Sequence, residues 1–481
     1  MMHIFFVNCA KKEVPSGLEC CVGHFKVLRD LLQEVLEKRL NNKEDFEQEI
    51  SIVVYDDNEQ ELSLPETQTL LKIFLPCLNI KVSNVDDWQT TLQLALKCQQ
   101  RIAVDKVTSS EYWMYSKHVD CHSGVTPCSL NMYSMTQHLA RLNDAQEDQN
   151  NGVLVRFLNG VNIKGIMEVP KSTNYYWSQL NTWDFSAHSL NTLELIACAR
   201  LIITKLCLAS NTPCLSEDEL NVFLIHLECA YHQVNKFHNF RHALDVMQAT
   251  YKLCDLLKLD PGHSLALCIS AVGHDVGHPG TNNDLFSSFG SPISKQYADN
   301  SVLENFHTDI FTGILRQHWP QYTTSLNLKN IKEAIISTDM ALHNRYLKQL
   351  SLSGTEKLRN NIPLLTSLII KAADISNVSR PLLVSAQWAV LLAYELNDCI
   401  LLEKKLKGQS VDVKQSKLGR DVDLPDSVED IVARFPRLPK DQLFFIDTFV
   451  LDLFAGLADK FKEVRFIHEN IQSNRDFWLQ Q

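Results

Sequence analysis

Histidine residues concentrate in one part of the 481-residue chain. Ten of the 17 histidines lie between His226 and His343, where a uniform scatter would place about four. Imidazole nitrogens bind divalent cations such as Zn²⁺, and imidazole also exchanges protons near neutral pH. This region is therefore where the sequence predicts a metal centre or an acid–base site.

The first cluster in this region is the stretch FHNFRHALD, residues 237–245. If the whole stretch is helical, His238 and His242 lie about 40° apart on one face of the helix. Such a pair, taken alone, is more typical of half-buried histidines with ordinary hydrogen bonds than of a functional site. Its interpretation depends on the rest of the chain.

The second cluster is AVGHDVGHPGTNNDL, residues 271–285, which contains His274, Asp275 and His278. Adjacent residues on a regular helix diverge by about 100°, so an adjacent His-Asp pair cannot face one ion from the middle of a helix. The glycines and the proline of this stretch permit a helix end or a distortion. We therefore expect a helix to stop near His274.

The third cluster is KAADISNVSRP, residues 371–381, in which Asp374 follows a long apolar run. A buried carboxylate needs a counter-charge, and a cation would provide one. The combined ligand set has two imidazoles and two carboxylates: His242, His274, Asp275 and Asp374. This mixture suits Zn²⁺ with positions left for water, and Asp275 could bridge to a second, harder ion such as Mg²⁺ or Mn²⁺. Two such ions would make the pocket locally cationic within a chain of net charge −11.

Seven motifs in this order resemble the class I cyclic nucleotide phosphodiesterases, and most of all the fungal high-affinity cyclic-AMP phosphodiesterases. The resemblance covers residues 182–481, and the motifs are FHNFRHALDV, HDVGHPGTNN, SVLENFH, STDMALH, KAADISN, AQW and QLFF. It implies an all-helical HD-type catalytic domain that contains two divalent metal ions. It also implies Zn²⁺ at the tighter site and Mg²⁺ or Mn²⁺ at the second.

The resemblance assigns roles to individual positions. The metal ligands would be His242, His274, Asp275 and Asp374, with His238 as general acid and His278 as a second catalytic histidine. The substrate would contact Gln442, Phe445, Asn377, Met340 and Trp388. The residues supporting the metal-water network would be Glu304, Asp339 and Asn283.

The implied reaction is hydrolysis of 3′,5′-cyclic AMP to 5′-AMP, which would lower cyclic-AMP signalling. Water activated by the metal ions would attack phosphorus, and His238 would protonate the leaving 3′ oxygen. Phe237, Gly277, Val378 and Asp452 depart from the residues usual in the family, which affects pocket shape and nucleotide preference. The amide of Gln442 could serve adenine or guanine. Another HD-type nucleotide phosphohydrolase and a catalytically silent nucleotide-binding regulator are the alternative functions.

The elements that must position these residues are mainly helical. Apolar residues at helical spacing recur with short polar breaks throughout residues 182–481, the expected catalytic domain. Residues 1–105 instead predict a small α/β domain, receiver-like in its order of elements. Its expected elements are strands at 3–7, 50–55 and 79–82 or 72–76, and helices at 24–40 and 86–98. Residues 106–181 form a connecting region, and the charged interval 407–430 predicts a mobile loop.

Composition excludes several other classes of protein. A net charge of −11 offers no broad basic surface for nucleic acid. The 14 cysteines form no CxxC motif, and the N-terminus lacks the pattern of a secretory signal, so we expect free thiols in a reducing compartment. No apolar run reaches the length of a membrane span. We expect a cytoplasmic location, with a nuclear one also compatible. The expected partners are a small cyclic nucleotide and a regulatory protein or second copy bound through the N-terminal region.

Overall fold

The computed structural model describes most of the expected catalytic domain and the main elements of the N-terminal region. The described residues are 2–9, 20–40, 50–55, 79–93, 157–231 apart from 159, 235–289, 292–407 and 424–481, with a few isolated positions between them. The predicted strand at 72–76, most of the predicted connecting region and most of the predicted loop at 407–430 lie outside these residues.

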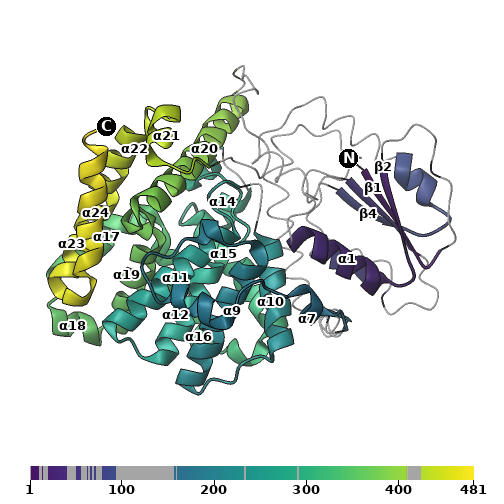
Figure 1. Cartoon of the computed structure of the whole chain (residues 1–481), viewed down its shortest axis with the longest axis horizontal. Helices are drawn as coiled ribbons and strands as arrows, with labels where there is room; N and C mark the ends of the chain where they lie inside the picture. Colours follow the sequence, from purple (N-terminus) through teal and green to yellow (C-terminus); the bar gives the residue numbers. More distant parts are fainter. Residues whose placement is uncertain are drawn as a thin grey trace.

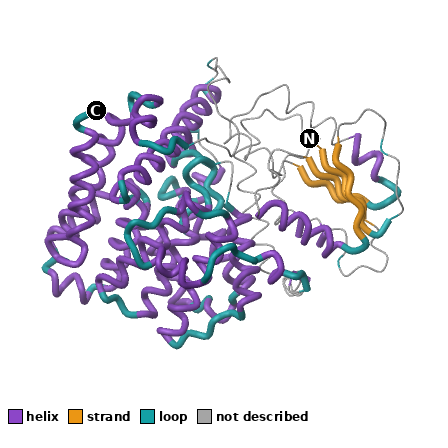
Figure 2. The backbone as a smooth tube through the Cα atoms, viewed as in Figure 1, coloured by secondary structure: helices purple, strands orange, loops and turns teal. Residues whose placement is uncertain are grey.

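A four-stranded parallel sheet forms the N-terminal unit, whose place in the molecule is shown in Figures 1 and 2. The strands are β1 (Met2–Val7), β2 (Cys20–Phe25), β3 (Ile50–Tyr55) and β4 (Asn79–Ser83), in the order β2-β1-β3-β4. Alternate residues of β1 are buried on opposite faces of the sheet. Phe5 and Val7 belong to the cluster that includes helix α1 (Leu28–Leu40), whereas Ile4 and Phe6 pack with Trp88. Burial on both faces is typical of parallel sheets.

The predicted strands at 3–7, 50–55 and 79–82 are confirmed, but the predicted helix at 24–40 begins too early. Residues 20–25 form the edge strand β2, and α1 starts at Leu28. The exposed and half-buried residues of β2 give it no continuous apolar run, so its sequence carries a weak strand signal. The strand order agrees with the first four positions of the flavodoxin-like arrangement found in receiver domains, and the receiver-like assignment stays a prediction.

The remainder of the described chain is helical (Figure 2). Its α-helices are α7 (Ile163–Ile166), α8 (Thr173–Leu180), α9 (Thr192–Ser210), α10 (Glu217–Ala230), α11 (Phe240–Leu257), α12 (Pro261–Gly273), α13 (Asn283–Ser288), α14 (Pro292–Gln296), α15 (Val302–His318), α16 (Ser325–Thr338), α17 (His343–Leu352), α18 (Thr355–Asn360), α19 (Ile362–Asp374), α20 (Leu382–Leu406), α21 (Val428–Arg434), α22 (Leu438–Phe445), α23 (Leu451–Lys460) and α24 (Arg465–Trp478). Short 3₁₀ turns include η3 (Met340–Leu342) and η4 (Ser376–Ser379), and a π-helical turn covers Ile446–Val450. The mainly helical fold class is confirmed.

Helices α11, α12 and α19 contact one another in the centre of this unit (Figure 1). Their starts and ends carry three of the sequence clusters. Helix α11 begins at Phe240 because the Asn239 side-chain oxygen accepts the N–H groups of Arg241 and His242, at 2.9 and 3.3 Å. His238 therefore precedes the helix, and the expectation of two histidines on one helical face was wrong.

Ten cysteines fall within the described residues, and none of these ten forms a disulfide bond. In this part of the chain, no helix combines the length and hydropathy needed to cross a membrane.

Candidate active site

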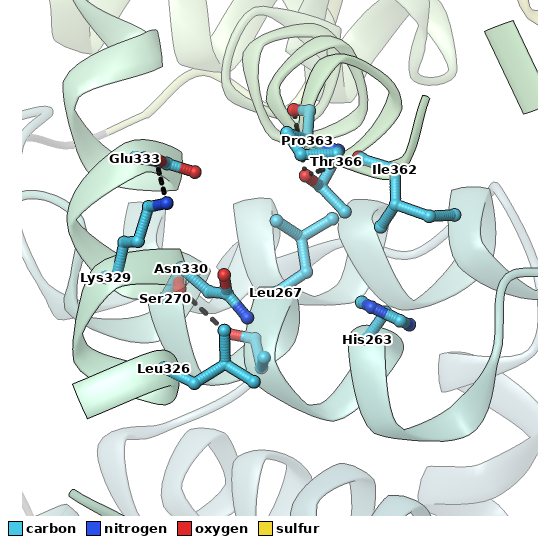
Figure 3. A pocket seen from close by; sticks show the side chains of 11 residues that line it. His263, Leu267, Ser270, Leu326, Lys329, Asn330, Glu333, Ile362, Pro363 and Thr366 are labelled. Carbon is cyan, nitrogen blue, oxygen red and sulfur yellow. Dashed lines mark hydrogen bonds and ion pairs between the residues drawn. The ribbon is translucent and has the colours of Figure 1, made fainter. Parts of the chain in front are cut away.

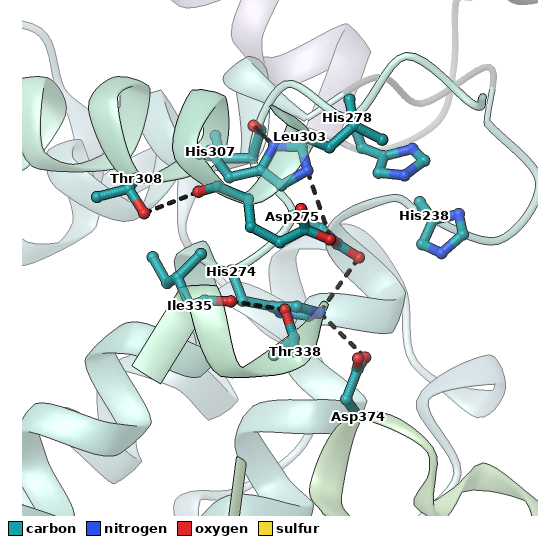
Figure 4. Close-up of polar contacts among 12 residues, drawn as sticks. His238, His274, Asp275, His278, Leu303, His307, Thr308, Ile335, Thr338 and Asp374 are labelled. Atoms are coloured by element: carbon teal, nitrogen blue, oxygen red, sulfur yellow. Dashed lines mark hydrogen bonds and ion pairs between the residues drawn. The ribbon is translucent and has the colours of Figure 1, made fainter. Parts of the chain in front are cut away.

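Four side chains from three segments meet at one point, and Figure 4 shows three of them: His274, Asp275 and Asp374. His242 lies in the first turn of α11, His274 directly follows α12, Asp275 is next to it, and Asp374 is the last residue of α19. The Nε2 atoms of His242 and His274 each lie 3.2 Å from the same oxygen, Oδ1 of Asp374. Oδ2 of Asp275 lies 3.2 Å from His274 Nε2 and 3.7 Å from His242 Nε2.

This arrangement fits a divalent cation. Bonds of about 2.0–2.2 Å to one ion place neighbouring ligand atoms about 3–3.4 Å apart, close to the spacing observed here. Each of the four residues offers an atom within 4.8 Å of the others. His274 Nδ1 donates to the Ala271 carbonyl at 2.7 Å, which leaves the Nε2 lone pair facing the cluster.

The charges of the cluster also favour a cation. Burial alone would raise the pKa of Asp275, but the adjacent His274 holds that pKa well below its ordinary value. Burial opposes ionisation of Asp374 as well, yet His274 and His242 lower its pKa strongly. Both carboxylates are therefore ionised at neutral pH and available as ligands.

The end of α12 allows adjacent residues to face one point. Gly277 has φ of +74°, a conformation that side-chain-bearing residues rarely adopt, and a Cβ there would lie 2.7 Å from Ile310. Helix α12 ends at Gly273, and tighter turns follow, in which the Val276 N–H donates to the Gly273 carbonyl at 3.2 Å and the His278 N–H to the Asp275 carbonyl at 3.0 Å. His274 itself keeps helical dihedral angles, with φ of −63° and ψ of −29°, and its ring still reaches the Asp275 carboxylate.

A second group beside the cluster contains His238, His278 and Glu395. The rings of His238 and His278 are stacked with centroids 4.0 Å apart. Glu395, on α20, pairs with Nδ1 of His238 and accepts the backbone N–H groups of Phe237 and His238 at 2.8 and 3.1 Å. Burial works against a charged His238, but the Glu395 charge and hydrogen bond raise its pKa to about 9. Burial and the nearby His238 instead hold the pKa of His278 well below its ordinary value.

An acidic group lies next to Asp275. Asn283 donates to both carboxylate oxygens of Glu304, at 3.4 and 3.1 Å, and Ser301 donates to Asp339 at 2.6 Å. Burial, together with the charge of Asp339, raises the pKa of Glu304 to about 7. Glu304 can therefore gain or lose a proton near neutral pH.

The predicted substrate-contacting residues lie on the C-terminal helices and turns. Gln442 is buried on α22, and its Oε1 has no hydrogen-bond partner among the described residues. The half-buried ring of Phe445 contacts Phe449, with centroids 5.7 Å apart. The ring of Phe449 in turn contacts that of His343, the residue directly after η3, with centroids 5.8 Å apart.

The other three predicted substrate-contacting residues lie on different elements and have different neighbours. Trp388 is fully buried, with its ring 5.9 Å from the His242 ring and 5.5 Å from that of Phe237. Met340 is half-buried in η3, with its sulfur 3.7 Å from Nζ of Lys371. Asn377 is buried in η4, three residues beyond the end of α19.

Sequence reasoning missed Glu395 and Asn235 and gave His307 no role. Glu395 interrupts the apolar run AQWAVLLAYEL, and that buried carboxylate was a usable signal. His307 Nε2 lies 3.7 Å from Asp275 Oδ1, and its Nδ1 donates to the Val276 carbonyl at 2.8 Å. Asn235 donates to the carbonyls of His238 and His278, at 3.0 and 2.7 Å.

A separate pocket of about 260 Å³ lies between α12, α16 and α19 (Figure 3). His263, Leu326 and Pro363 are among its lining residues, and Lys329 pairs with Glu333 beside it at 3.8 Å. None of the predicted site residues lines this pocket, so it is distinct from the metal cluster.

Comparisons with known proteins identify the family of this chain. The family model described as 3′5′-cyclic nucleotide phosphodiesterase matches residues 237–471. The chain is 38% identical to 3′,5′-cyclic-nucleotide phosphodiesterase 2 of Saccharomyces cerevisiae, over 91% of this chain and 89% of that protein. It is 30% identical to the human high affinity cAMP-specific and IBMX-insensitive 3′,5′-cyclic phosphodiesterase 8A, over 55% of this chain and 34% of that protein.

Solved structures similar to this chain are also those of phosphodiesterases. The crystal structure of yeast caPDE2 in complex with IBMX superposes with a TM-score of 0.80 at 25% identity, covering 100% of this chain and 99% of that one. The phosphodiesterase domain of a rhodopsin fusion protein from Salpingoeca rosetta gives a TM-score of 0.54 and covers 64% of this chain and 96% of that one. The chain therefore belongs to the 3′,5′-cyclic nucleotide phosphodiesterase family of metal-dependent hydrolases.

Proposed function

We propose that this phosphodiesterase hydrolyses 3′,5′-cyclic AMP to 5′-AMP and thereby lowers cyclic-AMP signalling. The observation that carries the proposal is the single oxygen of Asp374 that lies 3.2 Å from both His242 Nε2 and His274 Nε2. The choice of cyclic AMP is supported by the motif resemblance to the fungal high-affinity enzymes.

The metal centre is proposed at His242, His274, Asp275 and Asp374, with Zn²⁺ at the four-ligand position and Mg²⁺ or Mn²⁺ beside Asp275. When bound, such ions supply a nucleophilic water at neutral pH and neutralise charge that develops on the phosphoryl oxygens. The protein contributes two ionised carboxylates and two imidazoles; His242, His274 and Asp275 are buried, and Asp374 is half-buried.

His238 is the proposed general acid for the departing 3′ oxygen. An alkoxide is a poor leaving group, and a positioned acid contributes about 10²–10⁴-fold to the rate. A pKa of about 9 keeps the imidazole protonated at neutral pH. Because Glu395 engages Nδ1, the Nε2–H of His238 is the proton available to the substrate.

His278 is proposed to act as a neutral neighbour of the charged His238. Its Nδ1 accepts the N–H of Gly280 at 3.0 Å, which fixes the ring and assigns the proton to Nε2. We assign Glu304, Asp339 and Asn283 to the ordering of water beside Asp275. The pKa of about 7 for Glu304 lets that carboxyl act as a donor or an acceptor in this network.

Gln442 and Phe445 are proposed to hold the purine. The buried Oε1 of Gln442 lacks a partner among the described residues, and a base N–H would satisfy it. Phe445 offers a half-buried flat face for stacking. We assign Asn377, Met340 and Trp388 to the pocket wall.

We further propose the division into a small α/β domain (1–105), a connecting region (106–181) and the catalytic domain (182–481), in a cytoplasmic protein. The α/β unit would carry regulation or dimerisation. Arg29 of α1 donates to the Phe157 carbonyl at 3.4 Å and lies 4.9 Å from the centroid of its ring, a contact through which that unit could act on the rest.

The test is a turnover assay of purified protein with cyclic AMP, cyclic GMP and a nucleoside triphosphate, each with and without a chelator. We expect hydrolysis of cyclic AMP at the highest kcat/KM, and its loss in chelator. A preference for the triphosphate would favour another HD-type phosphohydrolase. Binding of cyclic AMP without turnover in the metal-loaded protein would favour a silent regulator.

A further inference from the structure

The hydroxyl of Tyr231 lies at the turn that carries the two adjacent metal ligands. Tyr231 directly follows α10, and its side chain is fully buried. The hydroxyl donates to the Val272 carbonyl at 2.9 Å and accepts the N–H of Asp275 at 3.3 Å. One side-chain oxygen therefore joins the last turn of α12 to the backbone of Asp275.

This contact satisfies groups that a helix end leaves without partners. The last four carbonyls of an α-helix have no intrahelical donor, and Val272 is one of them. The N–H of His274 reaches the Ala271 carbonyl only at 3.5 Å, so the helical hydrogen bonding weakens just before Asp275. The phenol supplies both a donor and an acceptor at this break.

A second link fixes the same turn from the same segment. The N–H of Gly277 donates to the Ala230 carbonyl at 3.1 Å, one residue before Tyr231. The ring of Tyr231 also packs edge-on against Phe240, with centroids 5.9 Å apart. Phe240 is the first residue of α11, two positions before His242. Residues 230 and 231 thus contact the start of α11, which carries His242, and the turn after α12, which carries His274 and Asp275.

We propose that Tyr231 is a positioning residue that holds Asp275 in the geometry required to bind the metal ion. The inference rests on the metal centre proposed above. Tyr231 does not touch the ion or the substrate in this scheme, and its effect passes through the backbone of Asp275. Groups that orient metal ligands typically change metal affinity or activity by about 10–100-fold when they are removed.

The test compares Y231F with Y176F. Tyr176 is also a buried phenol in the helical unit, but its hydroxyl donates to Glu194 at 3.0 Å, away from the metal cluster. Both substitutions remove one hydroxyl from a buried site and keep the ring. The matched control therefore separates loss of a buried hydrogen bond from loss of ligand positioning.

The measurements are the dissociation constant for Zn²⁺, obtained by competition with a chelator of known affinity, and the thermal midpoint of the metal-free protein. We expect Zn²⁺ affinity about tenfold or more below wild type in Y231F and unchanged in Y176F, with similar thermal midpoints in the two variants. Saturating Zn²⁺ should return much of the Y231F turnover. Equal Zn²⁺ affinity in Y231F and wild type would overturn the inference, as would an equal loss in Y176F.

Hydrogen–deuterium exchange gives a second measurement in the full-length protein. Without metal, the amides of residues 272–278 should exchange faster in Y231F than in wild type, whereas Y176F should leave them unchanged. Unaltered protection in Y231F contradicts the inference even if its affinity cannot be measured. Wild-type protein that binds no divalent ion would instead contradict the proposed metal centre, so the two failures are distinguishable.

Discussion

The carboxylate of Glu395 forms hydrogen bonds with both the ring and the backbone of His238, a residue 157 positions earlier in the chain. One oxygen pairs with Nδ1, and the other accepts the His238 N–H at 3.1 Å. Burial would otherwise favour the neutral imidazole, so this carboxylate is the main source of its raised pKa. The charges of Asp275 and Asp374 also raise this pKa, but by less.

The first prediction concerns E395Q and the pH profile. His238 should supply its proton up to about pH 9 in the wild type, and kcat should fall as the pH rises through that value. Without the Glu395 charge, burial dominates and lowers the pKa of His238. The alkaline limb of the kcat profile should therefore move down by at least about one pH unit.

The stabilisation that the His238–Glu395 pair gives the fold should also decrease as the pH rises. The folded-state pKa of His238 lies above its ordinary value of about 6.5. Its pair with Glu395 therefore stabilises the fold fully below that value and loses this effect as the pH rises towards about 9. The free energy of unfolding, measured at pH 6 and pH 9, should fall further below that of the wild type in E395Q at pH 6 than at pH 9. The control is E403Q, on the same helix, whose partner Lys407 is exposed to solvent.

The second prediction concerns H238A. Removal of the proposed acid should lower kcat by about 10²–10⁴-fold, because the 3′ alkoxide must then leave without a proton. Metal content, measured by elemental analysis, should remain that of the wild type. His263, half-exposed and paired with Asp260, provides the control H263A. Undiminished turnover in H238A would remove its assignment as the acid.

The third prediction concerns Q442A. Loss of one or two hydrogen bonds to the base, each about 0.5–1.5 kcal/mol, should lower kcat/KM by about 2–160-fold, mainly through KM. Steady-state kinetics with cyclic AMP and cyclic GMP check this, with Q321A at an exposed position as control. An unchanged KM for both nucleotides would show that Gln442 does not contact the base.

The fourth prediction concerns N235D, an isosteric change at a buried amide. Asn235 donates to the carbonyls of His238 and His278, and a carboxylate would place a third acceptor against them. The free energy of unfolding should fall by about 1–3 kcal/mol or more, and kcat should fall as the stacked imidazoles separate. Asn327 donates to the Tyr322 carbonyl at 2.8 Å outside the site, so N327D should lower stability but not kcat.

The sequence predicted the elements whose signals are local. The apolar runs at residues 3–7 and 50–55 form strands, and the buried side chains of residues 4–7 and 52–54 are consecutive in the sequence, so the signal for each strand is local. The angular argument about His274 and Asp275 anticipated a helix end, and α12 stops at Gly273. The ordered motifs identified the family, which the comparisons confirm.

The remaining features depend on contacts that no single stretch encodes. The cap formed by Asn239 moves the start of α11 past His238, although the residue spacing suits a continuous helix. In the sequence, Glu395 is a single charged residue on an apolar helix. Its partners, Phe237 and His238, become evident only in the structure, where α20 packs beside them. The hydroxyl of Tyr231 becomes significant only because α10 ends against the turn at Val272. Tertiary packing decides each of these cases.

The spread of the cluster along the chain has a consequence for biosynthesis. His242 and Asp374 are 132 positions apart, and Glu395 comes later still. A polypeptide emerging from the ribosome would present both imidazoles well before the second aspartate is translated. Binding of a cation by all four proposed ligands must therefore wait until most of the catalytic domain has been synthesised, and a truncated translation product that stops short of α19 would lack Asp374.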